Sequence, residues 1–118
     1  MTIITEALKY SAAGDELHGH LAYDDAISGE RPGVLIIHEW WGLNDYMRER
    51  AAQIAGLGYA ALALDMYGEG KVGSSADEAG ALMTTVLNDM DTGTARLQAG
   101  FDALAGHCLL YTSDAADE

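Results

Sequence analysis

Basic residues are scarce in this sequence, and their scarcity excludes one class of partner. Six lysines and arginines stand against 19 aspartates and glutamates, which gives a formal net charge of −13. A surface of this sign repels the phosphate backbone of DNA and RNA. We therefore expect no nucleic-acid partner.

Long hydrophobic runs and cysteines are also lacking. No apolar run approaches the roughly 18 residues of a membrane span, and the N-terminus does not resemble a secretory signal. Cys108 is the only cysteine among 118 residues, so it has no partner for an internal disulfide, which agrees with a reducing compartment. These absences predict a cytoplasmic protein that does not associate with membranes.

Proline occurs once, at Pro32, and the polar segment 24–33 around it predicts a loop. The preceding residues 2–23 predict two short strands around a turn at Gly14. Hydrophobic and polar residues alternate over residues 16–23, as in a half-buried strand. The chain therefore begins with a predicted hairpin.

Residues 34–37 and 59–64 are short apolar runs of the kind found in strands that are buried on both faces. Between them, hydrophobic residues recur at helical spacing over residues 43–58, and Asn44 can cap this helix. Strand, helix and strand within about thirty residues form a βαβ unit. The predicted fold class is therefore α/β, with a mostly parallel sheet.

Two further helices are predicted downstream. Ser75 and Glu78 have the spacing of a capping box at the start of the first. Its predicted apolar stripe consists of Ala79, Leu82, Met83, Val86, Leu87 and Met90. Residues 92–93 interrupt the pattern, and a second helix is predicted over residues 95–104. Its inward residues are expected to be Leu97, Phe101 and Leu104.

The C-terminal stretch departs from this alternation of strands and helices. A third buried strand is expected after the last helix, but residues 107–118 show neither strand alternation nor a helix face. Their sequence resembles translated sequencing-adapter read-through. We therefore expect residues 1–107 to form a partial domain and residues 108–118 to be a non-native tail.

An unusual cluster follows the first apolar run. His38, Glu39, Trp40, Trp41 and Gly42 come just past the carboxyl end of a predicted buried strand, where open α/β sheets place their ligand sites. A hydrophobic core needs no such cluster. Two simpler interpretations stay open: the glutamate is an ordinary exposed acid, and the tryptophan pair is an exposed surface for a partner.

Two segments resemble the dienelactone hydrolase family, namely residues 33–49 (GVLIIHEWWGLNDYMRE) and residues 58–68 (GYAALALDMYG). The resemblance covers most of residues 1–106. It implies the N-terminal half of an α/β-hydrolase fold, truncated after its first strands and helices. It also implies hydrolysis of a small-molecule ester or lactone through a covalent acyl-enzyme, with no metal and no organic cofactor.

The same resemblance assigns roles to four residues. In the family, the glutamate that matches Glu39 lies beside a nucleophilic cysteine and modulates its ionisation. The residue that matches Trp40 supplies a backbone N–H to the oxyanion hole. Trp41 and Tyr67 are expected to form walls of the substrate pocket.

The sequence also departs from the family pattern. The family nucleophile lies in a Gly-x-Cys-x-Gly turn, but Cys108 has no glycine two positions after it, and no Gly-x-Ser-x-Gly occurs. The triad acid and histidine would follow the nucleophile, so we expect this chain to be inactive by itself. Glu69 stands where some family members carry an arginine for a substrate carboxylate, which argues against an anionic dienelactone.

Other functions stay open as weaker alternatives. A short non-catalytic α/β binding module would use the tryptophan pair. A Rossmann-like nucleotide binder lacks its Gly-x-Gly-x-x-Gly motif, and residues 68–71 do not complete a phosphate loop. His18 and His20 share a predicted strand face but have no third metal ligand at useful spacing, so we interpret them as two solvated histidines.

Overall fold

The structure, a computed structural model, describes residues 3–12, 14–25 and 32–106, so Cys108 and the predicted tail lie outside the described residues. The elements are β1 (Ile3–Ala12), β2 (Asp15–Asp24), β3 (Gly33–Ile36), α1 (Asp45–Ala55), β4 (Ala60–Ala63), α2 (Ala76–Leu87) and α3 (Met90–Gly106). The sheet order is β1-β2-β4-β3; β3 and β4 are parallel and the other neighbours antiparallel. A hairpin followed by a βαβ unit confirms the predicted α/β class, while the sheet of the described residues is mixed rather than mostly parallel.

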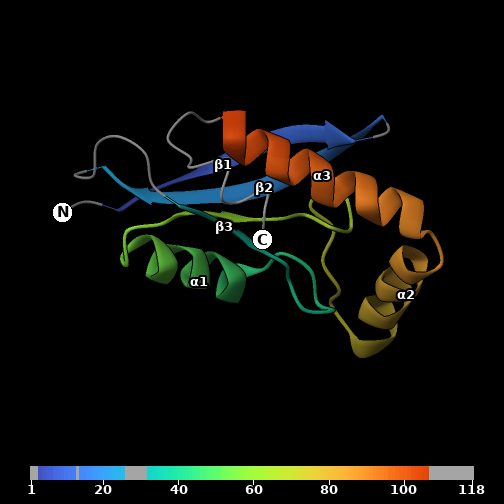
Figure 1. The fold of residues 1–118 in the computed structure, drawn as a ribbon. Helices are drawn as coiled ribbons and strands as arrows, with labels where there is room; N and C mark the ends of the chain where they lie inside the picture. The colour runs from blue at the N-terminus through green and yellow to red at the C-terminus, as the bar shows by residue number, and fades with distance from the viewer. Residues whose placement is uncertain (1–2, 13, 26–31, 107–118) are drawn as a thin grey trace.

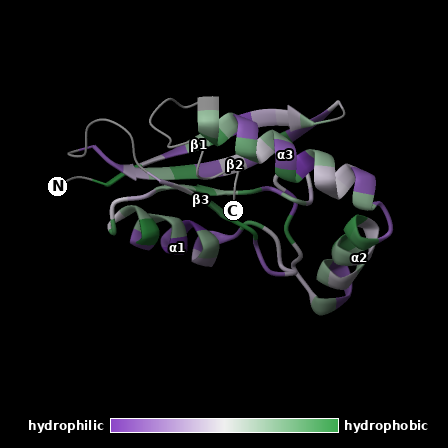
Figure 2. Cartoon of the chain, in the orientation of Figure 1, coloured by the Kyte–Doolittle hydropathy of each residue, from purple (hydrophilic) through white to green (hydrophobic). Residues whose placement is uncertain are grey.

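The two faces of the sheet are covered by different helices. α1 lies on one face and α3 on the other, while α2 lies beyond the strand ends, beside the start of α3 (Figure 1). The α1 face has an alanine core made of Ala22, Ala51, Ala55 and Ala61. The α3 face has a leucine core made of Leu21, Leu62, Leu64 and Leu104. Hydrophobic and hydrophilic residues alternate along α1, as expected of a helix that covers a core (Figure 2).

The predicted helix starts are confirmed by side-chain caps. Oδ1 of Asn44 accepts from the N–H of Met47 at 3.2 Å and begins α1. Oγ of Ser75 accepts from the N–H of Glu78 at 3.2 Å and begins α2. The carboxylate of Glu78 reaches the N–H of Ser74 at 3.0 Å, one residue earlier than a capping box requires.

The interpretation of the last two helices needs correction. The predicted apolar stripe of α2 is largely exposed, with Leu87 at 59% and Met83 at 38%, because α2 extends past the sheet. α3 begins at Met90 and includes residues 92–93, because Asp89 accepts from the N–H of Thr92 at 3.1 Å.

The side of α3 that faces the sheet also differs from the prediction. Leu97 is 38% exposed, whereas Leu104 is buried and Phe101 is partly buried. Gly100 lies directly over Leu64, where an added Cβ would be 2.2 Å from a Leu64 methyl carbon. The absence of a side chain at Gly100 therefore lets this helix pack closely on Leu64, which a hydrophobic pattern does not reveal.

The two parallel strands differ in burial. Every residue of β4 is buried, as predicted. The residues of β3 are only partly buried, and Ile37 just after it is 57% exposed. The reason is position: β4 lies between β2 and β3, whereas β3 is the last strand of the sheet in the part of the chain that is described.

Candidate active site

The candidate site is formed by two loops that leave the carboxyl ends of the parallel strands. We call residues 37–44 the β3 loop and residues 65–72 the β4 loop. An isolated bridge pairs Gly42 with Val72, and the N–H of Gly73 donates to the carbonyl of Trp41 at 2.8 Å. The two loops therefore form one unit at the edge where open α/β sheets bind ligands.

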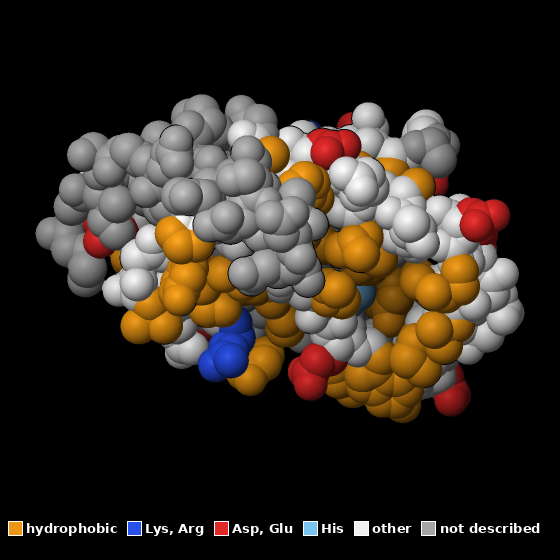
Figure 3. Space-filling model, viewed as in Figure 1, with side chains coloured by type: hydrophobic (Ala, Val, Ile, Leu, Met, Phe, Trp, Pro, Cys, Tyr) orange, Lys and Arg blue, Asp and Glu red, His pale blue; other side chains and the backbone are white. Residues whose placement is uncertain are grey.

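A cavity of about 160 Å³ opens between these loops and α2. Its described lining is Ile37, His38, Glu39, Trp40, Met66, Tyr67, Met83, Val86 and Leu87. Figure 3 shows hydrophobic side chains gathered around a hollow in which a histidine is visible. Most of the lining is apolar, and none of these residues is a lysine or arginine, so the cavity suits an apolar, uncharged group.

Three of the four predicted site residues meet at this cavity. Glu39, Trp40 and Tyr67 line it together, although the loop residues and the tyrosine are far apart in sequence. Trp41 is not part of its described lining. The ring of Trp41 is partly buried and packs against the ring of Trp40, with centroids 5.2 Å apart.

His38 was part of the predicted cluster but had no assigned role, and both of its ring nitrogens are engaged. Nδ1 donates to the carbonyl oxygen of Glu39 at 2.7 Å. Nε2 accepts from the N–H of Met66 in the β4 loop at 3.1 Å. Burial lowers the pKa of His38 below its ordinary value, since desolvation outweighs the opposing hydrogen bond and the nearby Asp65 charge. The ring is therefore held neutral.

Tyr67 links the two loops from the other side. Its hydroxyl donates to the carbonyl oxygen of Trp40 at 2.6 Å, and its ring meets His38 edge-on with centroids 4.7 Å apart. Burial raises the pKa of this hydroxyl, so it stays protonated and able to donate. The tyrosine therefore supports the β3 loop as well as lining the cavity.

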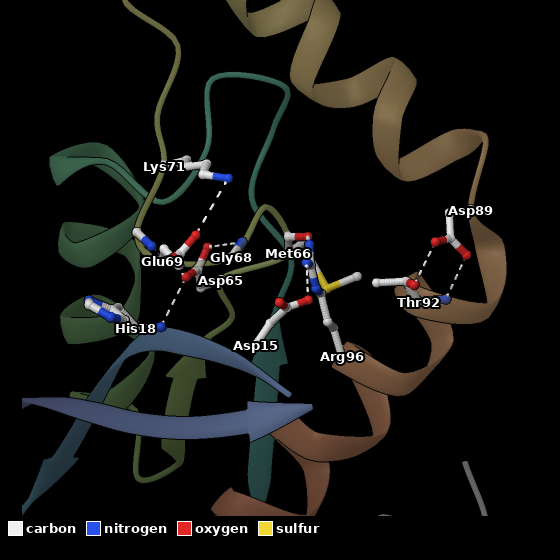
Figure 4. Close-up of polar contacts among 11 residues, drawn as sticks. Asp15, His18, Asp65, Met66, Gly68, Glu69, Lys71, Asp89, Thr92 and Arg96 are labelled. Carbon is white, nitrogen blue, oxygen red and sulfur yellow. Dashed lines mark hydrogen bonds and ion pairs between the residues drawn. The ribbon is translucent and has the colours of Figure 1, made fainter. Parts of the chain in front are cut away.

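Asp65 organises the β4 loop, a role that sequence reasoning missed. The side chain is 1% exposed, and its carboxylate accepts from the N–H groups of His18 (2.9 Å), Gly68 (2.9 Å) and Gly70 (2.8 Å) (Figure 4). Gly68, Glu69 and Gly70 all have positive φ, which lets the chain curl around the carboxylate. An aspartate at a strand end, followed by Gly-x-Gly, is the signal that could have revealed it.

Arg96 of α3 approaches the β4 loop from outside, and its polar contacts are with loop backbone and with the hairpin. Its guanidinium donates to the carbonyl of Met66 at 2.7 Å and pairs with Asp15 at 3.1 Å (Figure 4). The side chain is only 12% exposed. This arginine therefore fixes the β4 loop against α3.

The predicted histidine pair lies apart from the cavity. Nε2 of His18 contacts the carboxylate of Glu16 at 2.6 Å, while burial and the nearby Arg48 charge lower the pKa of His20. Over the described ranges of the chain, no group of three or more His, Cys, Asp or Glu residues could hold a metal ion. None of the helices there has the length and apolarity needed to cross a membrane.

Comparison with known proteins was made by sequence and by structure. The model of the dienelactone hydrolase family matches residues 17–109. Protein usf of Aquifex pyrophilus is 43% identical over 77 residues, which are 62% of this chain and 33% of that protein. The chain therefore spans about a third of this curated relative.

Two solved structures resemble the fold over nearly all of this chain. A dienelactone hydrolase-like promiscuous phosphotriesterase from metagenomic libraries superposes with a TM-score of 0.89 at 33% identity, covering 96% of this chain and 47% of that one. A protein named m3DLH superposes with a TM-score of 0.84, also at 33% identity, covering 89% of this chain and 44% of that one. In both, the matched region is less than half of the solved chain.

Proposed function

Because this chain belongs to the dienelactone hydrolase family, we propose that it forms the oxyanion and acyl-binding side of a hydrolase that cleaves ester or lactone bonds. The nucleophile is a cysteine or serine of the whole protein that this sequence does not contain. It attacks the substrate carbonyl carbon, the alcohol leaves with a proton, and water then releases the acid from the acyl-enzyme. Each addition step places a negative charge on the carbonyl oxygen.

One observation carries this proposal: Glu39 and Trp40 line a largely apolar cavity at the carboxyl ends of two parallel strands. The backbone N–H of Trp40 is the proposed donor to the carbonyl oxygen as charge develops there. Glu39 is proposed to govern ionisation of the nucleophile, since a nearby carboxylate disfavours a second negative charge. Tyr67 forms a wall of the acyl pocket.

The lining of the cavity supports a neutral acyl group over a charged one. Met66, Met83, Val86 and Leu87 supply an apolar surface, and Glu39 is the one acid in the described lining. A substrate carboxylate there would be desolvated beside a like charge with no cation to compensate, which is unfavourable. We therefore propose short-chain neutral esters or lactones as substrates.

A fusion enzyme tests the proposal. Residues 1–106 are joined to the region of the metagenomic phosphotriesterase that lies outside the 47% matched by this chain. The fusion is expected to hydrolyse p-nitrophenyl butyrate, while the 118-residue chain alone gives the buffer rate. Trp40→Pro removes the backbone N–H and should lower kcat by about 10²–10³-fold, the usual effect of losing one oxyanion donor.

Trp40→Ala is the matched control because it deletes the indole but keeps the N–H. Its kcat should stay within about tenfold of the parent fusion. A thermal melt of each protein distinguishes chemistry from folding. A folded fusion that leaves the ester intact, or equal kcat for the proline and alanine variants, would contradict the proposed function.

A further inference from the structure

The peptide group between Glu39 and Trp40 is held at its carbonyl end. Two donors converge on the carbonyl oxygen of Glu39: Nδ1 of His38 at 2.7 Å and the N–H of Gly42 at 3.1 Å. One donor is a side chain and the other closes a tight turn within the β3 loop. Together they leave this carbonyl little freedom to rotate.

A fixed carbonyl also fixes the N–H of the next residue. The described part of the chain contains no cis peptide, and in a planar trans peptide the C=O and N–H point in opposite directions. Anchoring the Glu39 oxygen to His38 and Gly42 therefore turns the Trp40 N–H away from them. Outside the helices and strands of the described residues, no backbone carbonyl accepts from this N–H.

The peptide that follows is held in the same way. The Tyr67 hydroxyl donates to the carbonyl oxygen of Trp40 at 2.6 Å, which sets the direction of the Trp41 N–H. The rings of Tyr67 and His38 touch edge-on, and both come from residues that line the cavity. The peptide groups before and after Trp40 are therefore both fixed by hydrogen bonds to their carbonyl oxygens.

The hydrogen bonds of His38 determine which nitrogen carries the proton. A carbonyl oxygen can only accept, so Nδ1 must be protonated; the Met66 N–H can only donate, so Nε2 must be unprotonated. With both nitrogens committed to backbone groups, the ring cannot also remove a proton from a substrate. The ring of His38 therefore contributes by fixing the positions of two backbone groups, and it does not transfer a proton.

We propose that His38 and Tyr67 are positioning residues, which hold the two peptide groups around Trp40 so that the Trp40 N–H stays directed into the site as an oxyanion donor. This inference rests on the proposed function for its purpose, but its geometry can be tested without catalysis. The β4 loop then acts as the frame, since its Met66 N–H donates to His38 and its Tyr67 hydroxyl donates to the Trp40 carbonyl.

Nuclear magnetic resonance of the ¹⁵N-labelled 118-residue chain tests the geometry directly. A long-range ¹H–¹⁵N spectrum reports the protonation of each imidazole nitrogen, and His38→Gln assigns the His38 signals by their loss. At neutral pH, His38 should be uncharged with its proton on Nδ1. A proton on Nε2, or a doubly protonated ring, overturns the proposal without any variant having to fold.

Residual dipolar couplings then report the direction of each backbone N–H. His38→Leu should move the Trp40 coupling away from the wild-type value, and Tyr67→Phe should move the Trp41 coupling. His38→Gln should restore the Trp40 coupling, because its amide can donate and accept. His18→Leu is the matched control, since it deletes a histidine contact with Glu16 away from the cavity.

The outcomes separate this inference from the proposed function. A Trp40 coupling that is unchanged in His38→Leu, or equally changed in His18→Leu, overturns the positioning role. The expected couplings together with a folded but inactive fusion enzyme would support the geometry and reject the hydrolase proposal. The expected couplings with an active fusion support both.

Discussion

The two loops at the candidate site are held in different ways. The β4 loop is held from within, by a buried carboxylate at Asp65 that accepts three backbone N–H bonds. The β3 loop, in which Glu39 and Trp40 are exposed, is held partly by its own residues, since His38 and Gly42 donate to the Glu39 carbonyl, and partly by contacts from the β4 loop. The difference teaches that the residues nearest the proposed chemistry do not determine their geometry alone. They depend also on a neighbouring loop that a buried carboxylate holds in shape.

Replacing Asp65, which anchors the β4 loop, should therefore have the largest effect on the stability of the protein. Asp65→Ala leaves three N–H groups, each in a buried or partly buried hydrogen bond, without their acceptor, at a cost on the order of 3–5 kcal/mol of unfolding free energy. Both loops should lose their shape, since Met66 and Tyr67 are next in the chain. Urea denaturation followed by circular dichroism measures the loss.

Asp65→Asn is the matched variant for this prediction. It has the same shape but keeps only one acceptor oxygen, so its loss should be about half that of the alanine variant. Equal stability of wild type and Asp65→Ala would show that the β4 loop is held by something other than this carboxylate.

The next largest effect should come from separating the two loops. Gly42 has φ of +99°, and a Cβ added there would lie 2.7 Å from the backbone oxygen of Lys71. Gly42→Ala combines backbone strain with a clash against backbone, so we expect it to cost about 2–3 kcal/mol.

Gly14→Ala distinguishes those two causes. Gly14 has a similar φ of +88°, but nothing lies within 4 Å of an added Cβ. Its substitution should therefore cost about 1 kcal/mol, from strain alone. Denaturation midpoints that fall equally in both variants would mean that contact between the loops contributes nothing.

Much of the fold could be predicted from the sequence because its signals are local. The hairpin, the βαβ unit and the caps at Asn44 and Ser75 depend on neighbouring residues, and all were found. The burial of α2 and of β3 depends on what other segments cover them. Periodicity shows which face of an element is apolar, but not whether a partner lies against it.

Most residues of the site could be predicted from the sequence, but the hydrogen bonds that hold them in place could not. Glu39, Trp40 and Tyr67 were predicted together and line one cavity, although their chemical roles stay predictions. The contribution of Asp65 was missed because its partners are backbone groups, which are the same in every sequence. His38 was noticed as part of a motif, but its partner Met66 lies 28 residues away along the chain.

A smaller effect is expected from one contact between the loops. Tyr67→Phe deletes only the hydroxyl that donates to the Trp40 carbonyl, and a partly buried hydrogen bond of this kind is worth about 1 kcal/mol. Tyr46→Phe is the control, because Tyr46 is 57% exposed on α1 and away from the cavity. The two urea midpoints should differ; equal midpoints would remove Tyr67 from the contacts that hold the β3 loop.

The smallest expected effect is a pH dependence that originates in His38. The folded protein holds its pKa below the ordinary value of 6.5, chiefly by burial, so the unfolded chain binds the proton more readily. The contribution of neutral His38 to the stability of the folded protein is therefore complete above pH 6.5. It is lost as the pH falls toward the pKa that His38 has in the folded protein. Protonation also removes the lone pair that accepts the Met66 N–H, so acid should loosen the contact between the loops as well as lower stability.

His20 has a lowered pKa too and contributes in the same direction, so the comparison must be made between variants. His38→Gln cannot titrate, and its unfolding free energy should fall less than that of wild type between neutral pH and about pH 5. His20→Gln should remove only its own part of the fall and leave the Met66 amide signal sensitive to acid. If the Met66 signal shifts equally with pH in wild type and in His38→Gln, the acid response does not pass through His38, and the β3 loop has another support.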